Sequence, residues 1–197
     1  MTDDELFRYI LLAGFILVFP IGIYHRVKSR TGEKLDRLQE GLFILVSLRL
    51  LGLMGMAGLL AFLIDPSWMA WSSVPLPVWL RWVGVPLGVL AAFFLTWTFR
   101  NLGKNLTDTV VTRKEHTLVM TGPYRWVRHP FYVSFALAVL ANSLATANWF
   151  LFVTSGVAIF LLVVRTRKEE DKLIERFGDA YRKYMEKTGR FLPRLMS

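Results

Sequence analysis

The residues best suited to chemistry lie between Gly122 and Tyr132, in the run Gly-Pro-Tyr-Arg-Trp-Val-Arg-His-Pro-Phe-Tyr. Two arginines, a histidine, two tyrosines and a tryptophan occur within these eleven residues. An apolar segment long enough to enter a bilayer follows directly, and polar side chains at such a boundary usually mark a functional site because they are costly to keep there. Glu169 and Glu170 follow the next apolar segment. The pattern predicts a membrane enzyme that takes a polar cofactor from one side and a lipophilic substrate from the other.

Pro130 is expected in the first turn of a helix, where its missing N–H costs nothing. The N-terminus of that helix, together with Arg128 and His129, would attract a carboxylate or a phosphate. For Arg125, an ordinary role as a positively charged anchor at the membrane surface is an equally good interpretation. This part of the sequence therefore predicts an anion-binding corner at the membrane boundary.

The charged tail from Arg165 onward is expected to continue as a helix. Its apolar residues fall on a single stripe: Leu173, Phe177, Tyr181 and Tyr184. Glu169 lies one turn before Leu173 on this stripe, so its charge should have a partner. Glu170 is rotated by about 100° on a helix, and the two glutamates need not have the same role. A solvated face of salt bridges is the alternative for this pair.

Composition narrows the class of protein. The chain has 197 residues, of which 54% are apolar, and a mean hydropathy of +0.41. It has no cysteine, which excludes disulfides, cysteine-ligated zinc and thiol nucleophiles. The three histidines are His25, His116 and His129, and a site with several histidine ligands is not expected. We therefore expect no metal.

Apolar runs and their flanking charges predict the topology. The runs are residues 7–24, 42–64, 78–99, 131–147 and 149–164. Lysines and arginines number 5 in 26–37, 6 in 100–128 and 10 after residue 164, whereas 65–77 has none. This alternation predicts five spans with the N-terminus outside and the C-terminus in the cytosol. The net charge of +9 then lies on one membrane face, which favours contact with anionic lipids over nucleic acid.

The last two runs nearly touch, and polar residues cluster at their junction: Asn142, Ser143, Thr146 and Asn148. We interpret them as a short helical hairpin with a tight turn. The predicted fold is an all-α polytopic membrane protein with about five transmembrane helices, the last two a short hairpin, plus a cytosolic C-terminal helix. Residues 1–197 would form one domain, with three spans in 1–99 and the cofactor-binding loop, hairpin and tail in 100–197.

The run from Gly122 to Tyr132, taken with Glu169-Glu170 and the tail, resembles the isoprenylcysteine carboxyl methyltransferases and related phospholipid methyltransferases. The tail residues that carry this resemblance are Leu173, Phe177, Gly178, Tyr181, Tyr184 and Pro193. The likeness extends over roughly residues 102–193. It implies an integral membrane methyltransferase that uses S-adenosylmethionine, with its active site at the cytosolic face. The acceptor would be lipophilic and enter from the bilayer, most simply as a prenylcysteine-type carboxylate.

The resemblance also implies roles for individual residues. The residues placed around the cofactor are Tyr124, His129, Pro130, Tyr132, Glu169 and Glu170. Arg128, Lys187 and Arg190 are candidate catalytic cations, since a carboxylate acceptor needs orientation rather than deprotonation. Two positions depart from the family pattern. Ser134 stands where glycine is usual, and Lys187 stands where arginine is common, and both departures concern the acceptor more than the methyl donor.

Other functions remain open at this point. A phospholipid, or a small lipophilic amine or thiol, could be the acceptor, and an amine would need its proton removed. Membrane sterol reductases have a similar Arg-His-Pro-x-Tyr stretch and use NADPH, although this chain is short for such an enzyme. A non-enzymatic membrane factor that kept the fold without turnover is the third possibility.

Overall fold

The computed structural model describes residues 2–29, 41–105 and 117–194. These residues form six α-helices and three short 3-10 helices, and they contain no strand beyond two isolated bridges. The α-helices are α1 (Asp3–Lys28), α2 (Leu42–Ile64), α3 (Val78–Leu102), α4 (Pro130–Thr146), α5 (Trp149–Phe177) and α6 (Asp179–Lys187). The 3-10 helices are η2 (Pro66–Ser72), η3 (Gly103–Asn105) and η4 (Gly122–Arg125). The prediction of an all-α fold is confirmed.

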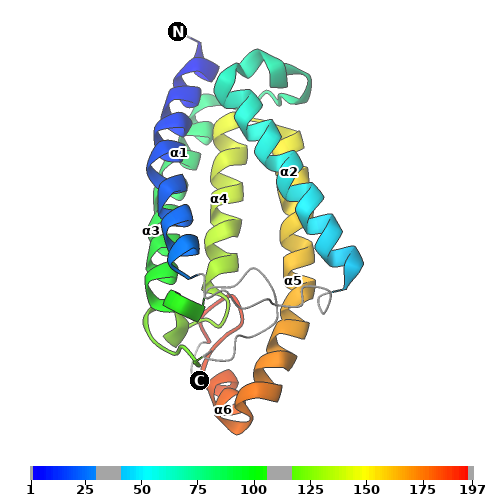
Figure 1. Cartoon of the computed structure of the whole chain (residues 1–197). Helices are drawn as coiled ribbons and strands as arrows, with labels where there is room; N and C mark the ends of the chain where they lie inside the picture. Colours follow the sequence, from blue (N-terminus) through cyan, green and yellow to red (C-terminus); the bar gives the residue numbers. More distant parts are fainter. Residues whose placement is uncertain (1, 30–40, 106–116, 195–197) are drawn as a thin grey trace.

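The five long helices run side by side, with the N-terminus at one end of the bundle and α6 and the C-terminus at the other (Figure 1). Four helices in the described ranges are long and apolar enough to cross a membrane, namely α1, α2, α3 and α5. The fourth predicted span, α4, is a shorter apolar helix of 17 residues. The chain is an integral membrane protein, and four of its five expected spans have the length and composition of membrane helices.

Local sequence explains how α1 begins and ends. Thr2 caps the helix, accepting a hydrogen bond from the Glu5 amide while the Glu5 carboxylate accepts one from the Thr2 amide. Acidic residues fill the first turn and basic residues the last, which matches the helix dipole at both ends. The same helix therefore places negative charge at one end of the bundle and positive charge at the other.

The turn between α4 and α5 is as tight as predicted. Ala147 adopts a left-handed conformation with φ of 48°, and Asn148 caps α5 by accepting a hydrogen bond from the Leu151 amide at 3.1 Å. The Asn148 amide group donates to the Ser72 hydroxyl at 2.7 Å, which ties the turn to η2. Arg81 of α3 donates two hydrogen bonds to the Ala145 carbonyl, at 2.9 and 3.0 Å.

The second arm of the hairpin is short only in its apolar part, and the charged tail continues the same helix from Arg165 onward, as expected. Helix α5 has 29 residues, because the charged segment after Val164 continues the helix that the apolar segment begins. The predicted single stripe is interrupted at Gly178, where a φ of 55° ends α5 and allows the chain to turn into α6. The separate C-terminal helix is thus only nine residues long.

Helices α3 and α4 pack closely. A Cβ atom added at Gly84 would lie 2.6 Å from the Ala141 carbonyl oxygen, which is too close for any residue other than glycine. Small residues allow helices in a membrane to approach in this way. Helix α2 instead packs against α5, and a large cavity lies between the α1–α3 side and the α2–α5 side of the bundle. Both helices of the hairpin, α4 and α5, thus contribute residues to the walls of this cavity.

Candidate active site

The segment before α4 is held in place by the C-terminal tail. The Trp126 carbonyl accepts a hydrogen bond from the Gly189 amide at 3.1 Å, and the Arg128 amide donates to the Gly189 carbonyl at 2.9 Å. The His129 amide donates to the Arg190 carbonyl at 3.1 Å. These bonds form a short parallel bridge, so residues about 60 positions apart in sequence create one rigid corner.

Glu170 lies at the centre of this corner. Its carboxylate accepts hydrogen bonds from the Arg128 Nε at 2.8 Å and from an Arg190 guanidinium nitrogen. The Arg128 guanidinium also donates to the carbonyls of Met185 and Thr188. Only 3% of the Glu170 side chain is exposed. A buried carboxylate with these cationic partners joins α5, the start of α4 and the tail.

His129 lies between the two glutamates. Its Nε2 is 3.2 Å from a Glu170 oxygen, and its Nδ1 is 4.0 Å from a Glu169 oxygen. Its ring stacks on the Tyr132 ring with centroids 5.4 Å apart and an angle of 6° between the planes. Pro130 occupies the first position of α4, as expected, and this fixes the direction in which the helix leaves the corner.

Glu169 has different surroundings from its neighbour. The Tyr132 hydroxyl donates to it at 2.7 Å, 28% of its side chain is exposed, and it lines the large cavity. Glu170 does not line that cavity. The expectation that the two glutamates face different ways is therefore met. Glu169 is the carboxylate that a bound molecule could reach.

Tyrosines form much of the remaining wall. Tyr124, Tyr181 and Tyr184 are buried, and all three line the cavity. The Tyr184 hydroxyl donates to the Tyr124 carbonyl at 2.6 Å. Burial raises the pKa of Tyr184 to about 12, so this hydroxyl remains a neutral donor at physiological pH. Burial, together with the charge of Glu169, likewise raises the pKa of Tyr124.

The structure does not bring every predicted site residue to the cavity. Arg128 lines it, whereas Arg190 contacts Glu170 from outside it. Lys187 is exposed in the last turn of α6 and is not part of the lining. Ser134 lines the cavity, and its hydroxyl donates to the Pro130 carbonyl at 2.9 Å, so the helix itself satisfies it.

Sequence reasoning missed Arg165 as a site residue. This side chain is only 9% exposed and lines the cavity. A signal was present in the sequence, because Arg165, Glu169 and Leu173 are spaced four residues apart and share one helix face. All three line the cavity.

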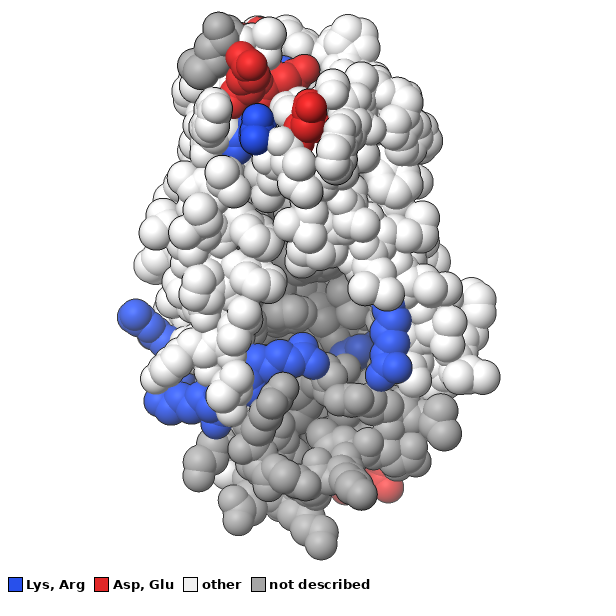
Figure 2. Space-filling model, turned by 45° about the horizontal axis from the view of Figure 1, so that its top comes forward, with Lys and Arg blue, Asp and Glu red and all other residues white. Residues whose placement is uncertain are grey.

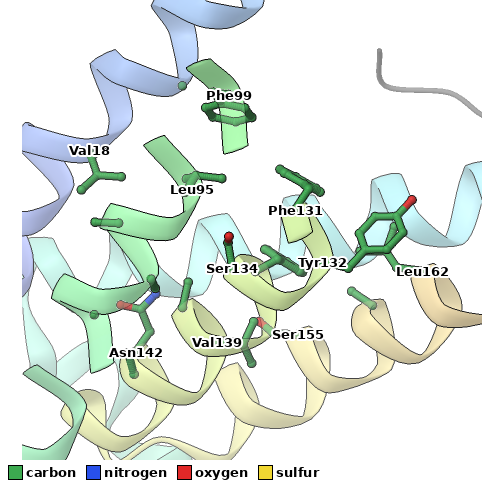
Figure 3. Close-up of a pocket in the computed structure, with 18 of the residues that line it drawn as sticks. Val18, Leu95, Phe99, Phe131, Tyr132, Ser134, Val139, Asn142, Ser155 and Leu162 are labelled. Carbon is green, nitrogen blue, oxygen red and sulfur yellow. The ribbon is translucent and has the colours of Figure 1, made fainter. Parts of the chain in front are cut away.

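The cavity has a volume of about 1870 Å³ and joins two environments. One end carries the polar cluster, with Arg128, His129, Arg165 and Glu169. The walls of the rest of the cavity are mainly apolar side chains from α1 to α5. Figure 3 labels ten of the lining residues: Val18, Leu95, Phe99, Phe131, Tyr132, Ser134, Val139, Asn142, Ser155 and Leu162. In Figure 2, lysine and arginine side chains surround a hollow in the lower half of the visible face.

This arrangement restricts the chemistry. At the polar end, the carboxylate and the aromatic rings can bind a cation, the carboxylate can accept hydrogen bonds from hydroxyl groups, and the buried guanidinium groups can bind an anion. The apolar chamber can receive a hydrocarbon. Among the residues that the structure describes, no group of three or more histidine, aspartate and glutamate side chains is placed to hold a metal ion. The residue His116 lies outside the described ranges.

Residues 83–175 match the isoprenylcysteine carboxyl methyltransferase (ICMT) family. The chain is 34% identical over 113 residues to a protein-S-isoprenylcysteine O-methyltransferase of Saccharomyces cerevisiae, covering 53% of this chain and 45% of that protein. It is 29% identical over 126 residues to a methanethiol S-methyltransferase of Mycobacterium tuberculosis, covering 64% and 46% respectively. The matched part thus spans under half the length of these curated relatives.

A solved structure of the eukaryotic intramembrane Ras methyltransferase ICMT has a similar fold. The TM-score is 0.53 at 20% sequence identity, and the match covers 81% of this chain and 54% of that one. At this identity the likeness concerns the fold alone. The family prediction made from residues 122–132 and the tail is confirmed by the sequence matches.

Proposed function

Because this chain belongs with the isoprenylcysteine carboxyl methyltransferase family through residues 83–175, we propose that it is an integral membrane methyltransferase acting on a lipophilic acceptor. The observation that carries the proposal is the single cavity that joins a polar cluster to an apolar chamber. A polar donor can bind at one end and a lipophilic acceptor at the other. The two would meet where Glu169, Tyr132 and Arg165 lie.

The residues present fit S-adenosylmethionine as the donor. Glu169 can accept hydrogen bonds from an ammonium group or ribose hydroxyls, and a charge-assisted bond of this kind is stronger than a neutral one. The ring faces of the cavity tyrosines suit a sulfonium or an adenine. Arg165 is a buried cation that can pair with a carboxylate. When bound, the donor supplies an electrophilic methyl group.

The other predicted cofactor residues take supporting roles in this proposal. Glu170 holds Arg128, Arg190 and His129 together, so it positions the corner rather than facing the cavity. Pro130 sets the start of α4, and His129 holds Tyr132 by stacking. Tyr124 forms a wall.

A prenylcysteine-type carboxylate is the acceptor we favour, since it arrives already ionised. Of the three cations predicted to orient it, Arg128 is in the cavity lining, and the buried Arg165 adds a second guanidinium there. A guanidinium attracts a carboxylate by its charge, although the Nε and one terminal nitrogen of Arg128 already donate to Glu170 and to two backbone carbonyls. Lys187 and Arg190 would act only if the acceptor extends beyond the described cavity lining.

A small thiol is the second candidate, and the similarity to methanethiol S-methyltransferases favours it. A thiol must lose its proton before it attacks. Glu169 and His129 are the groups near the cavity that could receive that proton. The matches found give no support to an NADPH-dependent reductase. A non-enzymatic factor would show itself as donor binding without turnover.

Two measurements test the proposal. Isothermal titration of the purified chain in detergent with S-adenosylmethionine should show saturable binding. Glu169→Gln should weaken it about tenfold or more, because a hydrogen bond to a charged group is lost, while Glu175→Gln, an exposed site on the same helix, should not change it. Absence of saturable binding would rule the proposal out.

Methyl transfer to candidate acceptors then identifies the substrate class. Labelled donor is supplied with a farnesylated cysteine, phosphatidylethanolamine or methanethiol. We expect label in the farnesylated cysteine ester, and label in the thiol alone would favour the second candidate.

The proposed orientation has the N-terminus outside and the polar end of the cavity at the cytosolic face, in contact with anionic lipids. The basic residues of α5, α6 and the tail support this orientation.

A further inference from the structure

Arg26 is a cation in the cavity lining that takes no part in the cluster around Glu170. It lies in the last turn of α1, and the buried Ser29 beside it belongs to the same lining. Both lie outside residues 83–175, the part of the chain that matches the methyltransferase family. The first helix thus adds a positive charge to a site whose other polar residues come from α4, α5 and the tail.

The end of α1 is held at the level of the polar end of the cavity, as Figure 1 shows. The His25 ring packs on Phe99 of α3 with centroids 5.5 Å apart, and the Phe99 ring lies 6.0 Å from Phe131, at the start of α4. The Ser29 hydroxyl donates to the Arg26 carbonyl at 2.9 Å and closes the last turn. Adjacent residues on a helix differ by 100°, so the face that carries Arg26 is not the face that His25 packs against α3.

The cations of the described lining are three: Arg26, Arg128 and Arg165. Arg128 already donates to a buried glutamate and to two backbone carbonyls. Two carboxylates enter the cavity under the proposed function, one on the methyl donor and one on the acceptor. Arg165 can neutralise one of them, so the other requires a further cation, and Arg26 supplies it.

Charge is the main difference between the acceptor and its product. The acceptor has an ionised carboxylate, whereas the methyl ester is neutral and keeps the same hydrocarbon tail. A guanidinium attracts the carboxylate strongly and gains much less from the ester. The apolar chamber binds the tail of both molecules alike. A cation near the head of the acceptor therefore favours binding of the acid and release of the ester.

We propose that Arg26 binds the carboxylate of the acceptor at the α1 wall of the cavity and so makes the site prefer the acid to its methyl ester. This inference rests on the proposed function, because it concerns the acceptor of the same cavity. Arg26 is a specificity-determining residue in this view. It acts on the head of the acceptor, and the hydrocarbon tail still occupies the apolar chamber.

A positively charged anchor at the membrane surface would behave differently. Lys28 is exposed in the same last turn but lies outside the cavity lining, and its ammonium is 3.5 Å from the Tyr24 hydroxyl. A surface cation attracts any anion within about one Debye length, about 8 Å at physiological salt. If Arg26 acted only in this way, removing the charge of Lys28 would have the same effect as removing that of Arg26.

A matched pair of probes tests the proposal: N-acetyl-S-farnesylcysteine and its methyl ester. Dissociation constants of both are measured by thermophoresis for the full chain in one detergent, at neutral pH and physiological salt. The wild-type chain should bind the acid more tightly, relative to the ester, than Arg26→Gln does. The expected change in this ratio is about tenfold, the effect of one partly exposed hydrogen bond between charged groups.

Variants separate contact in the cavity from other causes. Lys28→Gln should keep the wild-type ratio within about twofold, since it removes the same charge from the same turn outside the lining. Arg26→Lys should keep part of the preference, because the charge remains while the forked geometry is lost. Ester affinity within about twofold of wild type shows that a variant is folded with its apolar chamber intact. Comparing ratios between variants cancels unequal partition of the probes into detergent.

The outcomes are distinct. A ratio that is the same in wild type and Arg26→Gln overturns the inference, and so does an equal loss of preference in Lys28→Gln. Probe binding needs neither donor nor turnover. A chain that prefers the acid through Arg26 but binds no S-adenosylmethionine would refute the proposed function and leave this site standing. Saturable donor binding with a preference that ignores Arg26 would do the opposite.

Discussion

Glu169 and Glu170 are neighbours in sequence, yet their surroundings differ. Glu169 contacts Tyr132 and the cavity, whereas Glu170 is buried against Arg128, Arg190 and His129. A substitution at Glu169 should therefore affect binding, and one at Glu170 should affect folding. The contrast follows from the 100° that separates adjacent residues on a helix.

Glu170→Gln should destabilise the protein by about 3 kcal/mol, because it leaves buried cations without their counter-charge. Thermal unfolding in detergent measures the effect as a lowered midpoint. Glu175→Gln is the control, since its exposed pair with Lys172 contributes little. Equal midpoints for the two variants would contradict the structural role of Glu170.

Tyr184 gives a pH dependence. Its folded-state pKa of about 12 exceeds the ordinary value of 10, so the stabilisation is complete below pH 10 and is lost as the pH rises from 10 to 12. The unfolding midpoint should be nearly constant from pH 7 to 9 and fall above 10. Tyr184→Phe should be about 1 kcal/mol less stable at pH 7 and should show a shallower fall at high pH. A steeper fall in the variant would contradict this assignment.

At the level of residues, the family resemblance named nine site residues, and the structure places eight of them around one corner: Tyr124, Arg128, His129, Pro130, Tyr132, Glu169, Glu170 and Arg190. The ninth, Lys187, is exposed and lies outside the cavity lining. The sequence could not indicate that Glu170 faces Arg128, because the contact depends on how α5 is rotated against the corner. Arg165 was missed since it resembles the membrane-surface arginines beside it.

The contact between α3 and α4 determines the shape of the cavity. Gly84, near the start of α3, allows the backbone of that helix to approach Ala141, near the end of α4. Gly88, one turn further on, has ordinary room, since an added Cβ would lie 3.7 Å from the Ala141 Cβ. The two glycines thus offer a matched comparison on one helix.

Gly84→Ala should lower the stability by about 2 kcal/mol, because the new methyl group must displace backbone. Gly88→Ala should be neutral or stabilising by up to about 1 kcal/mol, the helix-propensity difference between the two residues. Unfolding midpoints in detergent compare the two variants. A larger loss for Gly88→Ala would show that the helices pack differently.

At the level of elements, hydropathy located all five long helices, and the polar cluster at residues 142–148 located the turn. The continuation of α5 beyond Val164 was predicted from the amphipathic pattern of the tail, but the residue at which the helix ends was not. The break at Gly178 depends on a backbone conformation that periodicity cannot show.

Acidic and basic residues are concentrated at opposite ends of the molecule. The first turn of α1 is acidic, whereas α6 and the tail, at the opposite end of the bundle in Figure 1, have more basic than acidic residues. In Figure 2, acidic side chains gather near the top of the visible face and lysine and arginine side chains lie mainly in its lower half. The alternation of charged and uncharged connections predicted this separation from sequence. The joining of the polar and apolar spaces into one cavity could not be predicted, because it requires the packing of five helices.

Topology is directly testable because the chain has no cysteine. Ser67→Cys lies in η2 at one end, and Lys183→Cys lies in α6 at the other, both at exposed positions. In bacterial cells expressing the protein, a membrane-impermeant maleimide should label Cys at 67 in intact cells and Cys at 183 only after permeabilisation. The reverse pattern would invert the proposed orientation.

The pairing of Gly189 with Trp126 and Arg128 has a practical consequence for handling the protein. A sequence inserted soon after Arg190 would lie close to the backbone that clamps the corner around Glu170. Affinity tags and fluorescent partners therefore belong on the opposite end, ahead of Thr2, where the helix cap is remote from the cavity mouth.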